Sequence, residues 1–160
     1  MLLFRSLLIL PFLALMACGF TPVYGPNGSV NVLLNSVLVQ EPKNREGYLL
    51  TKQIEKHLGR ATDPRFNLGV TVTTSETALN VDSTGNINRY NVLGLVEYTL
   101  RDTQTGQIAA SGRVNSFTGY SASGTTVSAQ AAKEDAQERL MIILADLLIS
   151  NLIATSDLPS

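Results

Sequence analysis

RYNVLGLVEYTLRD, residues 89–102, decides the fold, because its side chains alternate between apolar and polar along most of its length. A period of two predicts a β-strand with one buried face. The expected inner face holds Tyr90, Val92, Val96, Tyr98 and Leu100, and the expected outer face holds Arg89, Asn91, Glu97, Thr99 and Arg101. The next residues, Asp102 to Gly106, predict a hairpin connection to a returning strand.

The returning strand runs from Gln107 to about Tyr120 and alternates less regularly. Ile108, Ala110 and Val114 mark its inner face. Phe117 breaks that parity, so we expect a bulge or register change near Ser116.

Two further strands are predicted upstream. Phe66 to Thr73 alternates in the same way as residues 89–102, and Leu79 to Asn88 is rich in turn-forming residues and predicts a loop. Val30 to Val39 is rich in β-branched and aliphatic residues and precedes Glu41-Pro42, so we expect a first strand there.

Two helices complete the pattern. In residues 44–60 an apolar stripe of Leu50, Ile54 and Leu58 ends before Gly59, which predicts a helix with a glycine stop. The stretch from Ala129 to about Ile153 has no Gly or Pro and predicts a long helix, with Thr125, Thr126 or Ser128 as its N-cap. The order strand, helix, three strands, helix indicates an α+β domain.

The long helix is apolar around most of its circumference. One expected core stripe holds Ala136, Leu140, Ile143, Leu144 and Leu147, and a second stripe holds Met141, Ala145, Leu148 and Leu152. A helix that lies on a sheet buries one face, so a second stripe needs a second cover. Either a partner protein meets Met141, Leu148 and Leu152, or loops and the first helix cover them.

The first 17 residues predict an export signal: one cation at Arg5, an apolar run from Leu7 to Met16, then small Ala17. That run is too short to span a bilayer as a helix. The segment Leu15 to Cys18 is similar to the bacterial lipobox, which predicts cleavage before Cys18 and acylation of its thiol. An ordinary signal peptide or membrane anchor with an incidental cysteine is the alternative.

The expected organisation is therefore a signal peptide at residues 1–17, an acylated irregular arm at 18–29 and one domain at 30–160. Several acyl chains on one cysteine hold a protein to a membrane far more durably than one chain does. Gly19 after the cysteine, in place of Asp, implies sorting to the outer membrane, with the domain on the periplasmic side.

Composition excludes several classes of function. Only 16% of residues are charged and the net charge is −1, so we expect no nucleic-acid partner. No metal-binding, phosphate-binding or nucleophile motif is present, and the single histidine, His57, fits a structural role near a helix end. We therefore expect no enzyme activity, no metal and no cofactor.

The mature start Cys18-Gly19-Phe20-Thr21-Pro22-Val23-Tyr24-Gly25 resembles the Cys-Gly-Phe-x-Pro-x-Tyr-Gly start of divergent members of the LptE family of LPS-assembly lipoproteins. The strand and hairpin at 89–106, Tyr120 and the helix residues Ala131, Glu134, Asp135 and Ala136 also resemble that family's C-terminal pattern. The resemblance implies two helices on one face of a four-stranded, mostly antiparallel sheet. It also implies a partner, the outer-membrane β-barrel that translocates LPS, which the lipoprotein helps assemble, plugs and supplies with an LPS-binding element.

LPS is multiply anionic, so its site should offer arginine or lysine at partly shielded positions. Arg89, Arg101 and Arg113 fall on the expected non-core face, and the hairpin would let cross-strand neighbours cluster. These three are the candidate LPS-binding residues. Alternatively they solubilise the sheet or pair with Glu97 and Asp102.

A second function remains open from sequence alone. A lipoprotein regulator of a peptidoglycan synthase, or an auxiliary lipoprotein of a lipid ABC transporter, would share the tether and a small α+β domain. Such proteins make a reversible contact through one patch, whereas an apolar helix beside an open polar sheet suits enclosure in a barrel.

Overall fold

The computed structural model describes residues 29–81 and 87–155, so the predictions for residues 1–17, Cys18 and the rest of the arm to residue 28 lie outside the described residues. The elements in chain order are α2 (Ser29–Leu33), β1 (Val37–Val39), α3 (Arg45–Leu58), β2 (Phe66–Val81), β3 (Ile87–Asp102), β4 (Ile108–Ser121) and α4 (Thr126–Thr155).

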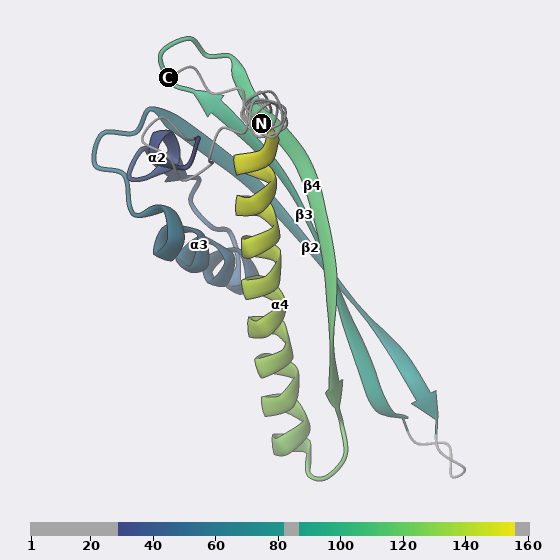
Figure 1. Ribbon diagram of the computed structural model, residues 1–160. Coiled ribbons are helices and arrows are strands. Elements are labelled where there is room, and N and C mark those ends of the chain that lie inside the picture. The colour runs from purple at the N-terminus through teal and green to yellow at the C-terminus, as the bar shows by residue number, and fades with distance from the viewer. Residues whose placement is uncertain (1–28, 82–86, 156–160) are drawn as a thin grey trace, which may run out of the picture.

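The strands form one sheet in the order β1-β2-β3-β4. β1 pairs parallel with β2, and the other two pairings are antiparallel. α3 and α4 lie on the same side of this sheet, and α4 runs along β3 and β4 (Figure 1). The predicted α+β class and the order of the main elements are confirmed.

The expected strand from Val30 to Val39 is wrong over its first half. Residues 29–33 form α2, and only Val37 to Val39 form a strand. Val30 and Leu33 lie one helical turn apart and are both buried. The helix therefore buries the same apolar residues that predicted a strand. Between them and β1, Asn35 has a φ of 55°, and its N–H donates to the Leu58 carbonyl over 2.7 Å.

α3 begins and ends as its sequence predicts. The Asn44 side chain accepts a hydrogen bond from the Gly47 N–H over 2.8 Å and caps the first turn. Gly59 ends the helix with a φ of 78°, and its N–H donates to the Glu55 carbonyl. A Cβ at this position would also collide with the Asn35 side chain, which fixes the turn before β1 against the end of α3.

The loop expected from Leu79 to Asn88 is too long. β2 continues to Val81 and β3 starts at Ile87, with register irregularities around Asn80. Residues 82–86 of the expected loop lie outside the described residues. The long hairpin extends beyond α3 at the far end of the sheet (Figure 1).

The bulge expected near Ser116 is also misplaced. The β3–β4 register is continuous from Arg89 to Leu100 and shifts only next to Arg101, which pairs with Ile108. That shift turns Ile108 to the outer face, where it is exposed, while Ala110 and Val114 stay buried. Phe117 needs no bulge, because it lies on the outer face opposite Leu93.

Asp102 holds the β3–β4 hairpin, whose predicted position at residues 102–106 is confirmed. Its Oδ1 accepts hydrogen bonds from the backbone N–H groups of Gln104 and Thr105 over 2.8 and 3.0 Å. The Thr105 bond, followed by the Gln104 bond and the nearby Arg65, keeps the pKa of the Asp102 carboxyl below its usual value despite partial burial. Gly106 supplies the positive φ that closes the turn.

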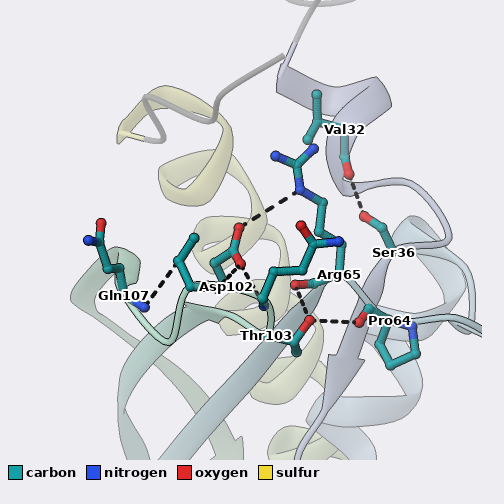
Figure 2. Close-up of polar contacts among 9 residues, drawn as sticks. Val32, Ser36, Pro64, Arg65, Asp102, Thr103 and Gln107 are labelled. Carbon is teal, nitrogen blue, oxygen red and sulfur yellow. Dashed lines mark hydrogen bonds and ion pairs between the residues drawn. The ribbon is translucent and has the colours of Figure 1, made fainter.

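The same hairpin is tied to the chain that enters β2. The Thr103 hydroxyl lies 2.8 Å from the Arg65 carbonyl oxygen and 3.1 Å from that of Pro64, and the Thr103 N–H also donates to Arg65 (Figure 2). Arg65 in turn places its guanidinium 3.9 Å from the Asp102 carboxylate and over the Phe66 ring. This corner fixes the end of the sheet that α3 covers.

The second apolar stripe of α4 is covered within the domain, together with part of the first. The sheet covers Leu140 and Leu144, while α3 packs beside α4 and contributes Leu50, Ile54 and Leu58 to the same core. The fully buried residues of α4 are Ala136, Leu140, Met141, Leu144, Ala145, Leu148 and Leu152. The expectation that Met141, Leu148 and Leu152 face a partner is therefore wrong in this fold.

The orientation of α4 about its own axis differs from the expected one, with the second stripe facing the core and α3. Because Met141, Ala145, Leu148 and Leu152 turn into the core, Ile143 and Leu147, which were expected in the core, turn outward and are 38% and 41% exposed. The alternative in which the first helix covers the second stripe is the one that the structure shows.

Two polar side-chain pairs align α3 with α4, namely the ion pair of Arg45 with Glu134 and the contact of His57 with Asp146. Arg45 lies 3.5 Å from Glu134, and His57 lies 3.3 Å from Asp146. Each helix advances twelve residues between the pairs, from 45 to 57 and from 134 to 146, so the helices run in the same general direction. All four side chains are about half exposed, so the pairs set alignment more than stability.

A polar cluster joins the first half of α4 to the long hairpin. Glu76 on β2 accepts a hydrogen bond from the Tyr120 hydroxyl over 2.8 Å, and its second oxygen lies 2.6 Å from the Lys133 ammonium. Tyr120 stacks on Tyr90 with ring centroids 5.3 Å apart. Burial raises the pKa of Glu76, but the Lys133 and Tyr120 hydrogen bonds outweigh it and leave the pKa lowered. Burial and the bond to Glu76 raise the pKa of Tyr120 to about 12.

Replacing Gly94 with alanine should destabilise the domain, because α4 packs directly onto this glycine. An added Cβ would lie 2.7 Å from Leu144 Cδ1 and 3.1 Å from Leu140 Cδ2. We expect a loss of about 1–3 kcal/mol in the free energy of unfolding, as for other overpacked cores, measured by urea denaturation. Gly69→Ala on β2 is the control, since its Cβ would meet nothing closer than 3.5 Å. Equal stability of the two variants would contradict this packing.

Glu76 should make the domain more stable above its unfolded-state pKa than below it. Its pKa is lower in the folded state, so its contribution is present above the unfolded pKa of about 4.3 and disappears as the pH falls through the folded value. Because the cluster is partly exposed, we expect about 0.5–1 kcal/mol. Glu76→Gln should lose this contribution at pH 7 and match the parent protein near pH 2, in denaturation series across that range. An unchanged difference at both pH values would contradict the assignment.

Candidate functional site

The face of the sheet opposite the helices carries the candidate site. α3 and α4 cover the face formed by the even-numbered residues of β2 and β3, as the contact of Gly94 with Leu140 and Leu144 shows. The odd-numbered residues form the other face, which none of the helices in residues 29–81 and 87–155 covers (Figure 1). We call it the open face. On β2 it presents mainly small polar groups, namely Asn67, Gly69, Thr71, Thr73, Ser75 and Thr77.

All three candidate arginines lie on the open face and are exposed, but they do not cluster. The register pairs Arg113 with Glu97, Arg101 with Ile108 and Arg89 with Ser121, so each arginine occupies a different row of the sheet. From the row of Arg113 to that of Arg89 is eight residues along β3, or about 27 Å at the usual strand rise. The expected cross-strand cluster is therefore wrong, and the cause is the register, which the hairpin alone did not reveal.

Arg101 has a structural task at the β3–β4 hairpin. Its Nη1 donates to the Gly106 carbonyl oxygen over 2.5 Å. A guanidinium engaged in closing the turn has fewer N–H groups to offer a ligand. Arg101 is therefore the weakest of the three candidates.

Arg89 borders a hollow of about 310 Å³ at the far end of the open face. Leu79, Asn91, Gly119 and Ser121 also line it. Gly119 lines the hollow without a side chain, and a Cβ there would lie 3.3 Å from the Asn91 side-chain oxygen. Leu79 is exposed, so the hollow combines a cation, an apolar group and uncharged hydrogen-bonding groups.

Arg113 borders a second, wider hollow of about 610 Å³ in the middle of the open face. Gly69, Thr71, Thr99 and Ser111 line it with Glu97, which lies directly across the strand pair from Arg113. The facing carboxylate offsets the charge of Arg113, so this hollow is less suited to an anion than the hollow at Arg89.

An exposed apolar pair lies between the two hollows. Phe117 and Leu93 are direct cross-strand neighbours on the open face and are 63% and 41% exposed. Sequence reasoning missed this pair, because the break in parity at Phe117 was interpreted as a bulge. The same alternation, followed without a bulge, would have placed Phe117 on the face of Arg113.

His57 joins α3 to α4, through Asp146 and through a 3.0 Å contact with Gln53. Within residues 29–81 and 87–155, no three His, Cys, Asp or Glu side chains come together as metal ligands could. In the same residues, no helix has both the length and the apolar character needed to cross a bilayer.

Comparisons with solved structures show lipoproteins of the same fold. A crystal structure from Caulobacter crescentus CB15, provisionally named a lipoprotein, is 27% identical with a TM-score of 0.66, covering 78% of this chain and 93% of that one. Rare lipoprotein B from Shewanella oneidensis is 17% identical with a TM-score of 0.58, covering 75% and 93%. A minor lipoprotein from Acinetobacter baumannii is 15% identical with a TM-score of 0.52, covering 74% and 91%. A search of the curated proteins finds no match.

The family comparison covers most of the described domain. The family model described as LptE, lipopolysaccharide-assembly, matches residues 34–152, from the turn before β1 nearly to the end of α4. The predicted family is thereby confirmed, because the match spans well over half of the 160 residues. The matched range includes the C-terminal pattern and begins after the Cys18 to Gly25 motif. The chain belongs to the LptE family of lipopolysaccharide-assembly lipoproteins.

Proposed function

We propose that this protein is a lipid-anchored outer-membrane lipoprotein that joins the β-barrel of the LPS translocon, helps it assemble, plugs it and binds LPS on its way to the cell surface. The observation that carries the proposal is the family match over residues 34–152, which implies a role in LPS assembly. The family consists of non-catalytic lipoproteins, so the protein is not an enzyme. Acylation of Cys18 and export by residues 1–17 are part of the proposal.

The open face supports the LPS-binding part of this proposal. LPS combines anionic phosphate groups with acyl chains and sugars, so a surface that holds it needs cations beside apolar and hydrogen-bonding groups. The hollow at Arg89 offers all three, with Leu79 and Asn91 beside the guanidinium. Arg113 and the pair Leu93 and Phe117 extend the same combination along the sheet.

The open face also supports enclosure by a larger protein. A sheet covered on one face only is ordinary for an antiparallel domain, but Phe117 at 63% exposure is costly to leave in water. In the rows next to it the open face carries Asn91 and Asn115, so the apolar area around Phe117 is bordered by polar groups. Ile142, Ile143 and Leu147 give α4 a second set of partly exposed apolar groups.

Affinity purification of the acylated protein from solubilised outer membrane should recover a large β-barrel protein. The physical reason is that a partner enclosing the domain would bury both the open face and the outer side of α4, an area well above that of a transient contact. Mass spectrometry would identify the partner. The Cys18→Ser form should leave the membrane fraction when made without the barrel. Recovery of a penicillin-binding protein or an inner-membrane transporter, and no barrel, would refute the proposal.

Changing Arg89 and Arg113 together to glutamate should weaken LPS binding by about ten- to a hundredfold, since a charge-assisted hydrogen bond of about 1.5–3 kcal/mol is lost at the stronger site. Binding of purified LPS to the folded variant would be measured by calorimetry. Lys52→Glu with Lys56→Glu on α3 is the charge-matched control, because both lysines are exposed and lie away from the open face. If both double variants lose affinity equally, the effect is one of net charge and the arginines are not the site.

A further inference from the structure

A groove at the free edge of the sheet adjoins the open face, because Asn67 of that face and Leu38, its register partner on β1, both line it. It has a volume of about 690 Å³ and lies between β1 and α3. β1 is the terminal strand of the sheet, so one of its backbone edges has no strand partner among the described residues. Val39, Leu38 and Pro42 form one wall, and Tyr48, Thr51 and Lys52 form the other.

The walls of this groove expose apolar groups that the rest of the core leaves uncovered. Tyr48 is 59% exposed and Leu38 is 43% exposed, whereas Val37 and Val39 on either side of Leu38 are buried. At the rim, Arg60 and Glu55 pair with each other over 3.2 Å. The charges of Arg60 and Glu55 therefore offset each other. The other two charged residues of the lining, Glu41 and Lys52, are of opposite sign, so the groove has no net charge that would favour a charged occupant.

We infer that this groove receives the protein's own amino-terminal arm, with residues 20–24 added to β1 as an extra strand. The arm is close at hand, because α2 starts at Ser29 and the turn after it bonds to the end of α3 at Leu58, next to the groove residues Arg60 and Ala61. The arm is also long enough. From residue 18 to residue 28 an extended chain reaches about 36 Å.

The sequence of the arm suits an edge strand. Residues 19–28 carry no charge, and Phe20, Pro22 and Tyr24 recur with a period of two. In an extended strand, the backbone groups of Thr21 and Val23 point to one edge and those of Pro22 to the other. Thr21 and Val23 therefore bond to β1, and the proline, which lacks an N–H, faces away from the sheet, the position that strands allow it. Residues 25–36 separate the arm from β1, which is about the dozen residues that a crossover between parallel strands requires.

One consequence concerns the membrane and rests on the proposed acylation of Cys18. If residues 20–24 lie in the groove, only Gly19 separates the anchor from a fixed point on the domain. The lipid then holds the β1 edge of the sheet at the bilayer surface. Without docking, the eleven residues 18–28 would be a loose tether. Docking therefore fixes the orientation of the open face relative to the membrane.

Disulfide trapping in the whole mature chain tests the inference. Because Cys18 is the only cysteine, Cys18→Ser leaves the introduced pair as the only thiols. Leu38→Cys is combined in turn with Phe20→Cys, Thr21→Cys, Pro22→Cys, Val23→Cys and Tyr24→Cys. Under mild oxidation we expect monomeric disulfides at alternate arm positions, at least about tenfold above the others, because a docked arm has a high effective concentration at the groove. Tyr48→Ala should reduce this yield.

Phe117→Cys in place of Leu38→Cys is the matched control, since it is exposed on the open face far from the groove. Its yield should be low at all five arm positions. Equal yields at Leu38 and Phe117, or high yields at Leu38 without alternation, would mean that the arm is only tethered and would overturn the inference. A disulfide-linked dimer would show a second copy in the groove and would overturn it too. The test uses neither barrel nor LPS, so its failure leaves the proposed function unaffected.

Discussion

Burial of α4 is the constraint on which the rest of the structure depends. Its apolar side chains extend over more than half of the helix surface, and a sheet can cover only part of that. α3 covers the remainder by lying beside α4, and the direct packing of Leu140 and Leu144 on Gly94 brings the helix close to β3. With α3 and α4 both needed on one side, neither is left to cover the other side of the sheet. The open face thus follows from the composition of α4.

The length of α4 has a second effect. Its first half extends beyond α3, where there is little apolar surface to bury, and polar contacts replace the core there. Glu76, Tyr120 and Lys133 join helix and hairpin, and the Thr118 hydroxyl donates to the Ala136 carbonyl over 2.8 Å. This half of the molecule is held by directional bonds that depend on pH and geometry, whereas the α3 half is held by a closed apolar core.

Sequence patterns predicted the elements well where one periodicity ran without interruption. Residues 89–101 alternate over a whole strand. Gly59 ends α3 with a positive φ, and Thr125 caps α4, because its Oγ1 accepts a hydrogen bond from the Ser128 N–H over 3.2 Å. Short or ambiguous segments failed. Val30 and Leu33 fit a helical turn as well as a strand, and contacts with the core decide between them. Phe117 suggested a bulge because aromatic residues are expected inside, and an exposed aromatic residue cannot be told from a register shift by pattern alone.

The sequence predicted which face of the sheet carries the candidate arginines, but it did not predict how far apart they lie. Parity placed Arg89, Arg101 and Arg113 on the correct side of the sheet, while their separation depended on cross-strand register, which a one-residue change near Arg101 controls. The separation now limits what the surface can bind. Arg89 and Arg113 stand about 27 Å apart on a paired backbone that cannot bring them together, so no single phosphate group meets both. A ligand that contacts both Arg89 and Arg113 must be a large amphiphile that also covers Leu93 and Phe117 between them. A smaller anion is confined to the hollow at Arg89, where no carboxylate faces the guanidinium across the strand pair.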